Sequence, residues 1–149
     1  MKKIIRRSHA FVRVPASTSN LGPGFDMLGL SLELVNEIEI EAGGHGPDSI
    51  EITGEGEKSL PRGAANLVLQ SARKLLPKSS CPAALTLKMT TRIPLARGLG
   101  ASAAARRGGL AAAHALLAED PFAKDEALLR AACELEGHPD NVVAAFYGG

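Results

Sequence analysis

The chain has 149 residues, of which 45% are hydrophobic and 22% charged, a composition that favours one packed domain over disorder. Its 17 basic and 16 acidic residues leave a formal net charge of +1, which excludes a protein held on nucleic acid or a membrane surface mainly by charge. With four Phe, one Tyr and no Trp, it also lacks the aromatic side chains on which single-stranded bases stack.

The N-terminal segment is basic, and Arg6, Arg7 and Arg13 interrupt every apolar run that could form a secretory signal. No stretch of 18 apolar residues predicts a membrane span. Cys81 and Cys133 are too far apart in sequence for a CxxC metal site and too few for a disulfide framework. We therefore expect free thiols and a cytoplasmic location.

The pattern of residues 10–52 predicts mainly strands. Residues 10–15 predict a short strand, and 16–27 a polar loop rich in Gly and Pro. Apolar residues then alternate with small or polar ones from Leu28 to Ile40, which predicts a strand with one buried face. A turn at 43–48 followed by Ile50 and Ile52 predicts a return strand and a hairpin.

The second half is mainly helical. The spacing predicts a helix over 64–76 that Pro77 ends, a strand over 85–91, and a helix of small residues from Ala101 to Ala118. Asp120 and Pro121 predict the cap and first position of a helix that runs to about Glu136. Asp140 is a candidate N-cap of a last short helix. Strands followed by helices indicate an α+β fold.

A glycine-rich segment, GLGAS at 98–102, lies between the predicted strand 85–91 and the helix that begins at Ala101. Glycines let the backbone approach an anion, and the first N–H groups of a helix are free to bind one. The hydroxyl of Ser102 adds a ligand for phosphate or Mg²⁺. The segment therefore predicts a phosphate-binding loop.

The glycine spacing also has to be compared with two other nucleotide-binding patterns. A Walker A loop is excluded because the chain contains no G-x-x-x-x-G-K-[ST]. Gly98, Gly100 and Ala103 fit the dinucleotide pattern G-x-G-x-x-A, but six residues separate them from the strand end, where that pattern begins. A purely structural glycine turn, with Ser102 capping the helix, remains open from these residues alone.

Three segments together resemble the GHMP kinases, and within them the homoserine kinases. IPLARGLGASAAA resembles the family's phosphate loop, whose usual form is P-x-x-x-G-L-G-S-S-A-A. PASTSNLGPGFDMLGLSL, at 15–32, and EGHPDNVVAAFYGG, at 136–149, resemble the first and last conserved segments of the homoserine kinases. The resemblance implies the ribosomal protein S5 domain 2-like fold, with a mixed or antiparallel sheet and helices on one face.

The resemblance implies an ATP-dependent kinase that phosphorylates the side-chain hydroxyl of L-homoserine in threonine biosynthesis, with ATP and Mg²⁺ as cofactors. On the substrate side it points to Asn20, Asp26 and His138; a carboxylate such as Asp26 suits an ammonium group. Asn66 matches a position near adenine, although it could equally cap the helix there. The phosphate loop comprises Arg97, Gly98, Leu99, Gly100, Ala101 and Ser102.

The same resemblance implies metal and catalytic residues. Glu136, together with Ser102, matches the magnesium ligands, since hard Mg²⁺ prefers oxygen; Glu134 remains a competitor. Asp140 and Asn141 match the place of a catalytic base or of groups that position the acceptor hydroxyl, whereas Asp140 as a helix cap is the structural alternative.

The chain departs from the family pattern at two places. Ala101 replaces the first loop serine, which removes a hydroxyl but keeps the backbone N–H. Arg106 and Arg107 stand where small residues are usual; they could be costly to bury against the sheet or could face the loop and add to anion binding.

The resemblance covers nearly all of this chain but only the first half of the enzyme. We expect residues 1–149 to form the ATP-binding N-terminal domain, with the C-terminal GHMP domain absent and the isolated chain inactive. The rival functions are another small-molecule GHMP kinase, of the mevalonate or shikimate type, and a non-catalytic nucleotide-binding fragment. The chain could form a homo-oligomer under any of these functions.

Overall fold

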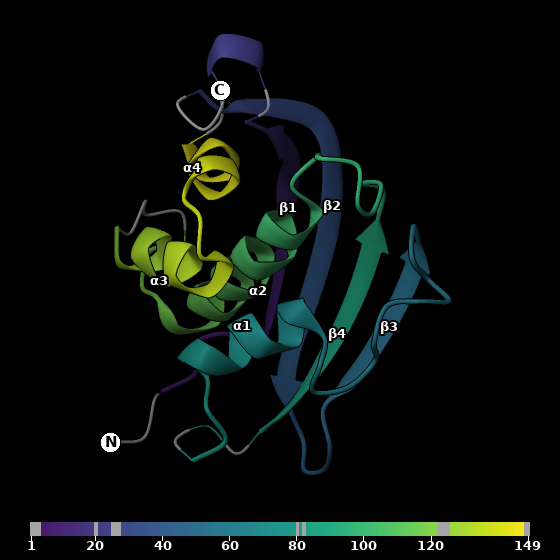
Figure 1. The fold of residues 1–149 in the computed structure, drawn as a ribbon. Coiled ribbons are helices and arrows are strands. Elements are labelled where there is room, and N and C mark those ends of the chain that lie inside the picture. Colours follow the sequence, from purple (N-terminus) through teal and green to yellow (C-terminus); the bar gives the residue numbers. More distant parts are fainter. Residues whose placement is uncertain are drawn as a thin grey trace.

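The protein is described here by a computed structural model that covers residues 4–19, 21–24, 28–79, 81, 83–121 and 126–147. In these residues a mixed sheet carries its helices on one face, the α+β architecture predicted from the sequence (Figure 1). The elements in chain order are β1 (His9–Thr18), η1 (Gly22–Gly24), β2 (Leu30–Gly43), β3 (Ser49–Gly54), α1 (Leu67–Leu75), β4 (Ala84–Thr91), α2 (Ala101–Leu117), α3 (Glu126–Glu136) and α4 (Asp140–Tyr147).

The strands stand in the order β1-β2-β4-β3, with β2 antiparallel to β1 and β4, and β3 parallel to β4. The predicted hairpin between the second and third strands is therefore wrong, because β4 lies between them. Helix α1 connects β3 to β4 across the sheet, and such a crossover is what a parallel pair requires. The alternating pattern predicted the strands correctly but carried no information on which strands pair.

The alternation along β2 separates a buried face from a polar one. Ile38 and Ile40 lie in the core, whereas Glu39 and Glu41 face the side without helices. The prediction fails at the start of the strand, where Leu28 and Leu30 are exposed. There α4 packs on the backbone at Gly29 instead: a Cβ on Gly29 would lie 2.9 Å from Ala144 Cβ.

Small residues allow α2 to pack closely on the elements around it. A Cβ added at Gly108 would lie 2.2 Å from Ile38 Cδ1 of the sheet, and one added at Gly109 would lie 2.2 Å from the carbonyl oxygen of Val68 in α1. Helix α2 is therefore the central helix, in contact with the sheet and with α1, α3 and α4.

The last two helices differ in detail from the prediction. Asp120 and Pro121 lie in a bend and a turn, and the described part of the next helix begins at Glu126. Helix α4 begins at Asp140 itself, and the carbonyl of Pro139 accepts the first helical bond, from Val143 N. Among the described helices, none is both long and apolar enough to cross a membrane.

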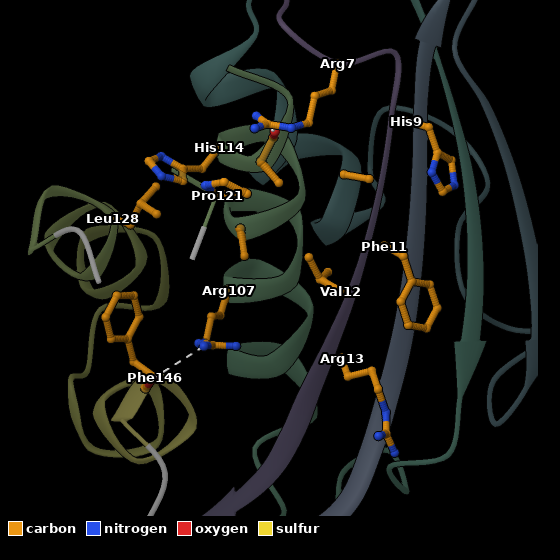
Figure 2. Close-up of a pocket in the computed structure, with 13 residues that line it drawn as sticks. Arg7, His9, Phe11, Val12, Arg13, Arg107, His114, Pro121, Leu128 and Phe146 are labelled. Carbon is orange, nitrogen blue, oxygen red and sulfur yellow. Dashed lines mark hydrogen bonds between the residues drawn. The ribbon is translucent and has the colours of Figure 1, made fainter. Parts of the chain in front are cut away.

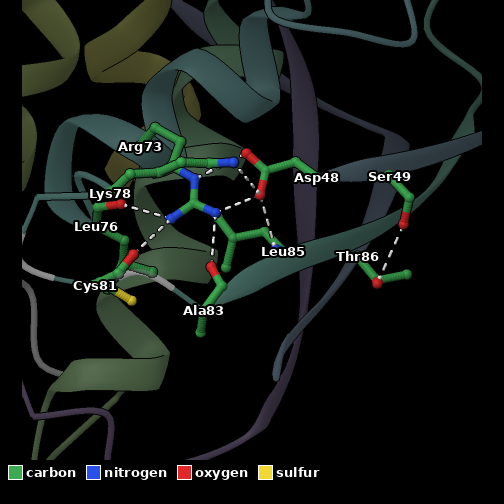
Figure 3. Close-up of polar contacts among 9 residues, drawn as sticks. All are labelled: Asp48, Ser49, Arg73, Leu76, Lys78, Cys81, Ala83, Leu85 and Thr86. Carbon is green, nitrogen blue, oxygen red and sulfur yellow. Dashed lines mark hydrogen bonds and ion pairs between the residues drawn. The ribbon is translucent and has the colours of Figure 1, made fainter. Parts of the chain in front are cut away.

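An ion pair anchors the end of α1 to the sheet (Figure 3). Arg73 forms two hydrogen bonds to the Asp48 carboxylate, one of them from Nε to Oδ2 at 3.0 Å. It also donates to the carbonyl oxygens of Leu76, Cys81 and Ala83. The Arg73 and Asp48 side chains are only 13% and 10% exposed. This one guanidinium therefore fixes the chain between α1 and β4.

Candidate functional site

The connection from β4 to α2 forms one wall of the site, and a buried amide holds its start. Asn36 of β2 accepts hydrogen bonds at its Oδ1 from the backbone N–H groups of Arg92 (2.7 Å) and Ile93 (3.0 Å). Asn36 lies in phase with the buried residues of β2, between Leu34 and Ile38. An apolar residue there would leave both N–H groups without this acceptor.

The loop itself turns in left-handed backbone conformations. Gly98 has φ 69° and Gly100 has φ 65°, and Ala96 also has a positive φ, of 55°. Gly100 is the N-cap of α2 and supplies no side-chain cap, and the first helical bond runs from Ala104 N to Gly100 O. Ser102 thus does not cap the helix, and the first turn of α2, with its partial positive charge, opens toward the loop. This is the geometry of an anion-binding helix start.

A cavity of about 300 Å³ lies beside this helix start and is lined mainly by apolar side chains. Ala101 and Ser102 form its edge at the loop, and Leu60, Met89 and Leu95 contribute to its apolar wall. Such a cavity next to an anion site fits a flat apolar group joined to a phosphate.

Asn66 lines the same cavity and caps α1, so the capping role is observed, whereas its place near adenine stays a prediction. Its Oδ1 accepts from the N–H groups of Val68 (3.0 Å) and Leu69 (3.2 Å), and its Nδ2 donates to Pro61 O at 2.9 Å. The side chain is therefore held rigidly in the cavity wall.

The two predicted magnesium ligands are in contact. Ser102 Oγ donates a hydrogen bond to Glu136 Oε1 across the α2–α3 interface. The competitor, Glu134, is 68% exposed and pairs with Lys74 at 2.9 Å. Among the described residues no group of three or more His, Cys, Asp and Glu side chains could by itself hold a metal ion. Ser102 and Glu136 fit Mg²⁺ as partial ligands, to be completed by phosphate oxygens and water.

The end of β1 and the start of α4 meet at the other side of Gly100. Ser17 Oγ donates to Asn141 O and Oδ1, both at 3.1 Å, and Ser17 N donates to Leu99 O at 3.1 Å. A Cβ on Gly100 would lie 2.4 Å from Ser17 Oγ and 3.3 Å from Asn141 Oδ1. The phosphate loop therefore lies directly against the segment that contains Asp140 and Asn141.

Asp140 is held as a carboxylate of low basicity. Burial acts to raise its pKa, but the hydroxyl of Ser19 at 2.5 Å, the N–H of Asn141 and the nearby His138 outweigh burial, so the pKa lies below its ordinary value. The carboxylate thus lies at the start of α4, as a cap would, but it also accepts a hydrogen bond from Ser19, the residue that follows β1. Such a group accepts hydrogen bonds well and takes up a proton poorly.

The remaining predicted residues lie around this centre. Arg97 and His138 are exposed, and Leu99 packs on the small cluster of Val14, Ala16, Ile93 and Ala104. Asn20 and Asp26, predicted to hold the amino-acid substrate, lie outside the described residues. Their predicted role stays a prediction.

Sequence reasoning missed three polar residues of the site: Ser17, Ser19 and Asn36. Ser17 and Ser19 were assigned to a loop, whereas β1 extends to Thr18. The available signals were the two-residue spacing of the serines beyond the predicted strand and an amide in phase with buried apolar residues.

A larger cavity, of about 470 Å³, lies on another face of α2, between β1 and helices α3 and α4 (Figure 2). It shares no lining residue with the smaller cavity. Figure 2 shows Arg107 reaching from α2 toward Phe146, whose ring lies 5.2 Å from the guanidinium carbon. Burial lowers the pKa of Arg107. The loop and the start of α2 line the smaller cavity, and the polar cluster of Ser17 and Asn141 adjoins Gly100, so the candidate functional site lies at this end of α2.

Comparison with known proteins identifies the family of the chain. The family model of the GHMP kinases N-terminal domain matches residues 66–149, more than half of the chain, including the loop and α4. The chain belongs to the GHMP kinase family. It is 49% identical over 139 residues to a homoserine kinase of Moorella thermoacetica, and 48% identical over 141 residues to one of Carboxydothermus hydrogenoformans. The family predicted from three short motifs is thereby confirmed.

Solved structures of GHMP kinases share the fold. The crystal structure of homoserine kinase from Cytophaga hutchinsonii matches all of this chain with a TM-score of 0.80 and 30% identity, and the chain covers 49% of that protein. A mevalonate kinase from Staphylococcus aureus matches with a TM-score of 0.67 at 17% identity, which shows the fold alone. The chain spans about half the length of the curated relatives it matches: 46% and 45% of the two homoserine kinases named above.

Proposed function

We propose that this GHMP kinase chain is the nucleotide-binding part of a homoserine kinase, which transfers the γ-phosphoryl group of ATP to the side-chain hydroxyl of L-homoserine in the cytoplasm, as a step of threonine biosynthesis. The observation that carries the proposal is the uncapped start of α2 at Gly100, beside an apolar cavity that contains Asn66. The identity to named homoserine kinases, 49% in one case, supports the choice of substrate within the family.

In this proposal the phosphate loop, Arg97 to Ser102, binds the phosphates of ATP at the helix start, and the cavity accepts the adenine. Phosphoryl transfer needs positioning and charge neutralisation more than covalent chemistry. Ser102 and Glu136 would hold Mg²⁺, which supplies charge neutralisation on the phosphates. The contact between these two side chains supports the assignment of Glu136 over Glu134.

Asp140 and Asn141 would position the acceptor hydroxyl. The low pKa of Asp140 and its hydrogen bond from Ser19 support a role in accepting hydrogen bonds, not in removing a proton. Asn20, Asp26 and His138 would bind the amino-acid end of homoserine.

The first test measures nucleotide binding by the 149-residue chain. Mg-ATP should bind, and Gly100→Val should weaken binding by at least tenfold, because Val would be strained at φ 65° and would clash with Ser17 Oγ. Gly44→Val is the control: it is strained at φ 67° in the turn after β2, where an added Cβ meets no atom within 4 Å. A folded wild-type chain that does not bind nucleotide would contradict the proposed site.

The second test concerns the substrate. In NMR titrations of the nucleotide-bound chain, L-homoserine should shift the signals of Ser19, His138 and Asp140, whereas mevalonate and shikimate should not. The chain alone is expected to show no homoserine-dependent consumption of ATP. A response to mevalonate with none to homoserine would refute the proposed substrate, and measurable turnover would refute the expected inactivity.

A further inference from the structure

Glu136 has contacts on both of its carboxylate oxygens. Ser102 Oγ donates to Oε1, and Arg106 Nε donates to Oε2 at 2.7 Å. The Arg106 and Glu136 side chains are only 21% and 18% exposed. The carboxylate assigned above to Mg²⁺ is thus already paired with a cation of the chain itself.

Helix geometry explains why Arg106 reaches this carboxylate. Residues 102 and 106 are one turn apart on α2 and therefore lie on the same face. Glu136, the last residue of α3, faces this part of α2 and contacts both side chains. Arg107 projects about 100° further around the helix, toward Phe146, and so cannot substitute for Arg106.

The Arg106 guanidinium and a divalent metal ion would compete for the single carboxylate of Glu136. One carboxylate carries one negative charge, which the Arg106 guanidinium neutralises through a short, charge-assisted hydrogen bond. A divalent cation draws its affinity from the charge of its carboxylate ligands and is repelled by a nearby guanidinium, most strongly where water is partly excluded. Binding of the metal at Glu136 must therefore act against Arg106.

We propose that Arg106 is a positioning residue that competes with the divalent cation for Glu136 and so weakens the coupling between metal and nucleotide binding. This inference rests on the proposed nucleotide site. The arginine fixes the carboxylate against Ser102, but it keeps the metal affinity of the chain lower than that of a chain with an uncharged residue at this position.

The test measures this coupling directly, without enzymatic activity. The dissociation constant of fluorescent mant-ADP is measured with EDTA and with saturating Mn²⁺. The constant in EDTA divided by the constant in Mn²⁺ gives the coupling, so a higher ratio means that the metal strengthens nucleotide binding more. Arg106→Met keeps the length of the side chain and removes its charge, so we expect it to raise the ratio about tenfold. Arg106→Lys should stay within about threefold of the wild type.

Arg130→Met is the matched control, because it removes the same charge from an exposed position on α3 and should leave the ratio unchanged. In a Glu136→Gln background, Arg106→Met should no longer raise the ratio. That result would show that Arg106 acts through Glu136. Circular dichroism verifies folding of each variant, and Arg106→Gln serves as a second neutral variant should the Met variant not fold.

An unchanged or lower ratio in folded, nucleotide-binding Arg106→Met or Arg106→Gln would overturn the inference and leave the proposed function intact. An equal rise in Arg130→Met, or one that persists with Glu136→Gln, would also overturn it. Absence of mant-ADP binding by the folded wild-type chain would instead overturn the proposed nucleotide site, and the inference with it.

Discussion

At the scale of single residues, some side chains of the candidate site both form hydrogen bonds to backbone groups and line the cavity. Asn66 caps α1 through its Oδ1, donates to Pro61 O through its Nδ2, and lines the cavity beside the phosphate loop. Asn36 likewise holds the start of the loop and lines the same cavity. Each of these two side-chain amides thereby ties the shape of the cavity to one element, Asn66 to α1 and Asn36 to β2.

The two roles of Asn66 can be separated. Asn66→Ala should lower the free energy of unfolding by about 1–2 kcal/mol, because an N-cap is lost. Asn66→Ser should recover most of that loss, since its hydroxyl can accept from the same N–H groups, yet should still weaken mant-ADP binding because the amide is gone from the cavity. Urea unfolding and mant-ADP titration measure the two effects. Nucleotide affinity that is unchanged in Asn66→Ser would restrict Asn66 to capping.

At the scale of elements, α2 sets the distances between the parts of the site. Its N-terminus would form the proposed anion site, its first turn carries Ser102, and its glycines allow close contact with both the sheet and α1. The alanines on its buried faces keep these distances short. The site is therefore sensitive to any added volume along this helix.

Gly109→Ala tests this packing. The new Cβ would lie 2.2 Å from the carbonyl oxygen of Val68, which belongs to the backbone and cannot rotate away. The gain in helix propensity, about 1 kcal/mol, should be outweighed, so we expect a net loss of about 1–3 kcal/mol in the free energy of unfolding. Gly63→Ala, where no atom lies within 4 Å of the added Cβ, should be neutral in the same urea titration. If Gly109→Ala were as stable as the wild type, α1 and α2 could move apart at little cost in free energy.

At the scale of the whole molecule, the buried ion pair of Asp48 and Arg73 joins the two halves of the β3–α1–β4 unit. Burial acts to raise the pKa of Asp48, but hydrogen bonds from Arg73 and from Leu85 N, with the charge of Lys78, outweigh it and keep the pKa below its ordinary value. A carboxyl whose pKa is lowered by folding stabilises the protein above its unfolded-state pKa. That stabilisation is lost as the pH falls through the folded-state pKa.

Asp48→Asn should therefore lower the free energy of unfolding at pH 7 by about 3 kcal/mol, because it leaves the Arg73 guanidinium buried without its counter-charge. The difference from the wild type should shrink as the pH falls from about 5 toward 2. Glu51→Gln, at an exposed position on β3, should change stability by less than about 0.5 kcal/mol. Thermal unfolding followed by circular dichroism between pH 2 and pH 7 checks both, and a gap that is constant with pH would contradict the role given to the Asp48 charge.

The sequence by itself determined the α+β class, most of the strand and helix segments and the family, because these depend on local periodicity, turn residues and short contiguous motifs. It did not determine that β4 lies between β2 and β3, since an alternating pattern defines a face of a strand but not its neighbour. Only the tertiary structure decided that Glu136 contacts Ser102 while Glu134 points to Lys74, and that Arg106 and Arg107 diverge from one helix. Those outcomes depend on how α3 and α4 pack against α2, which brings together residues 30 or more positions apart in sequence.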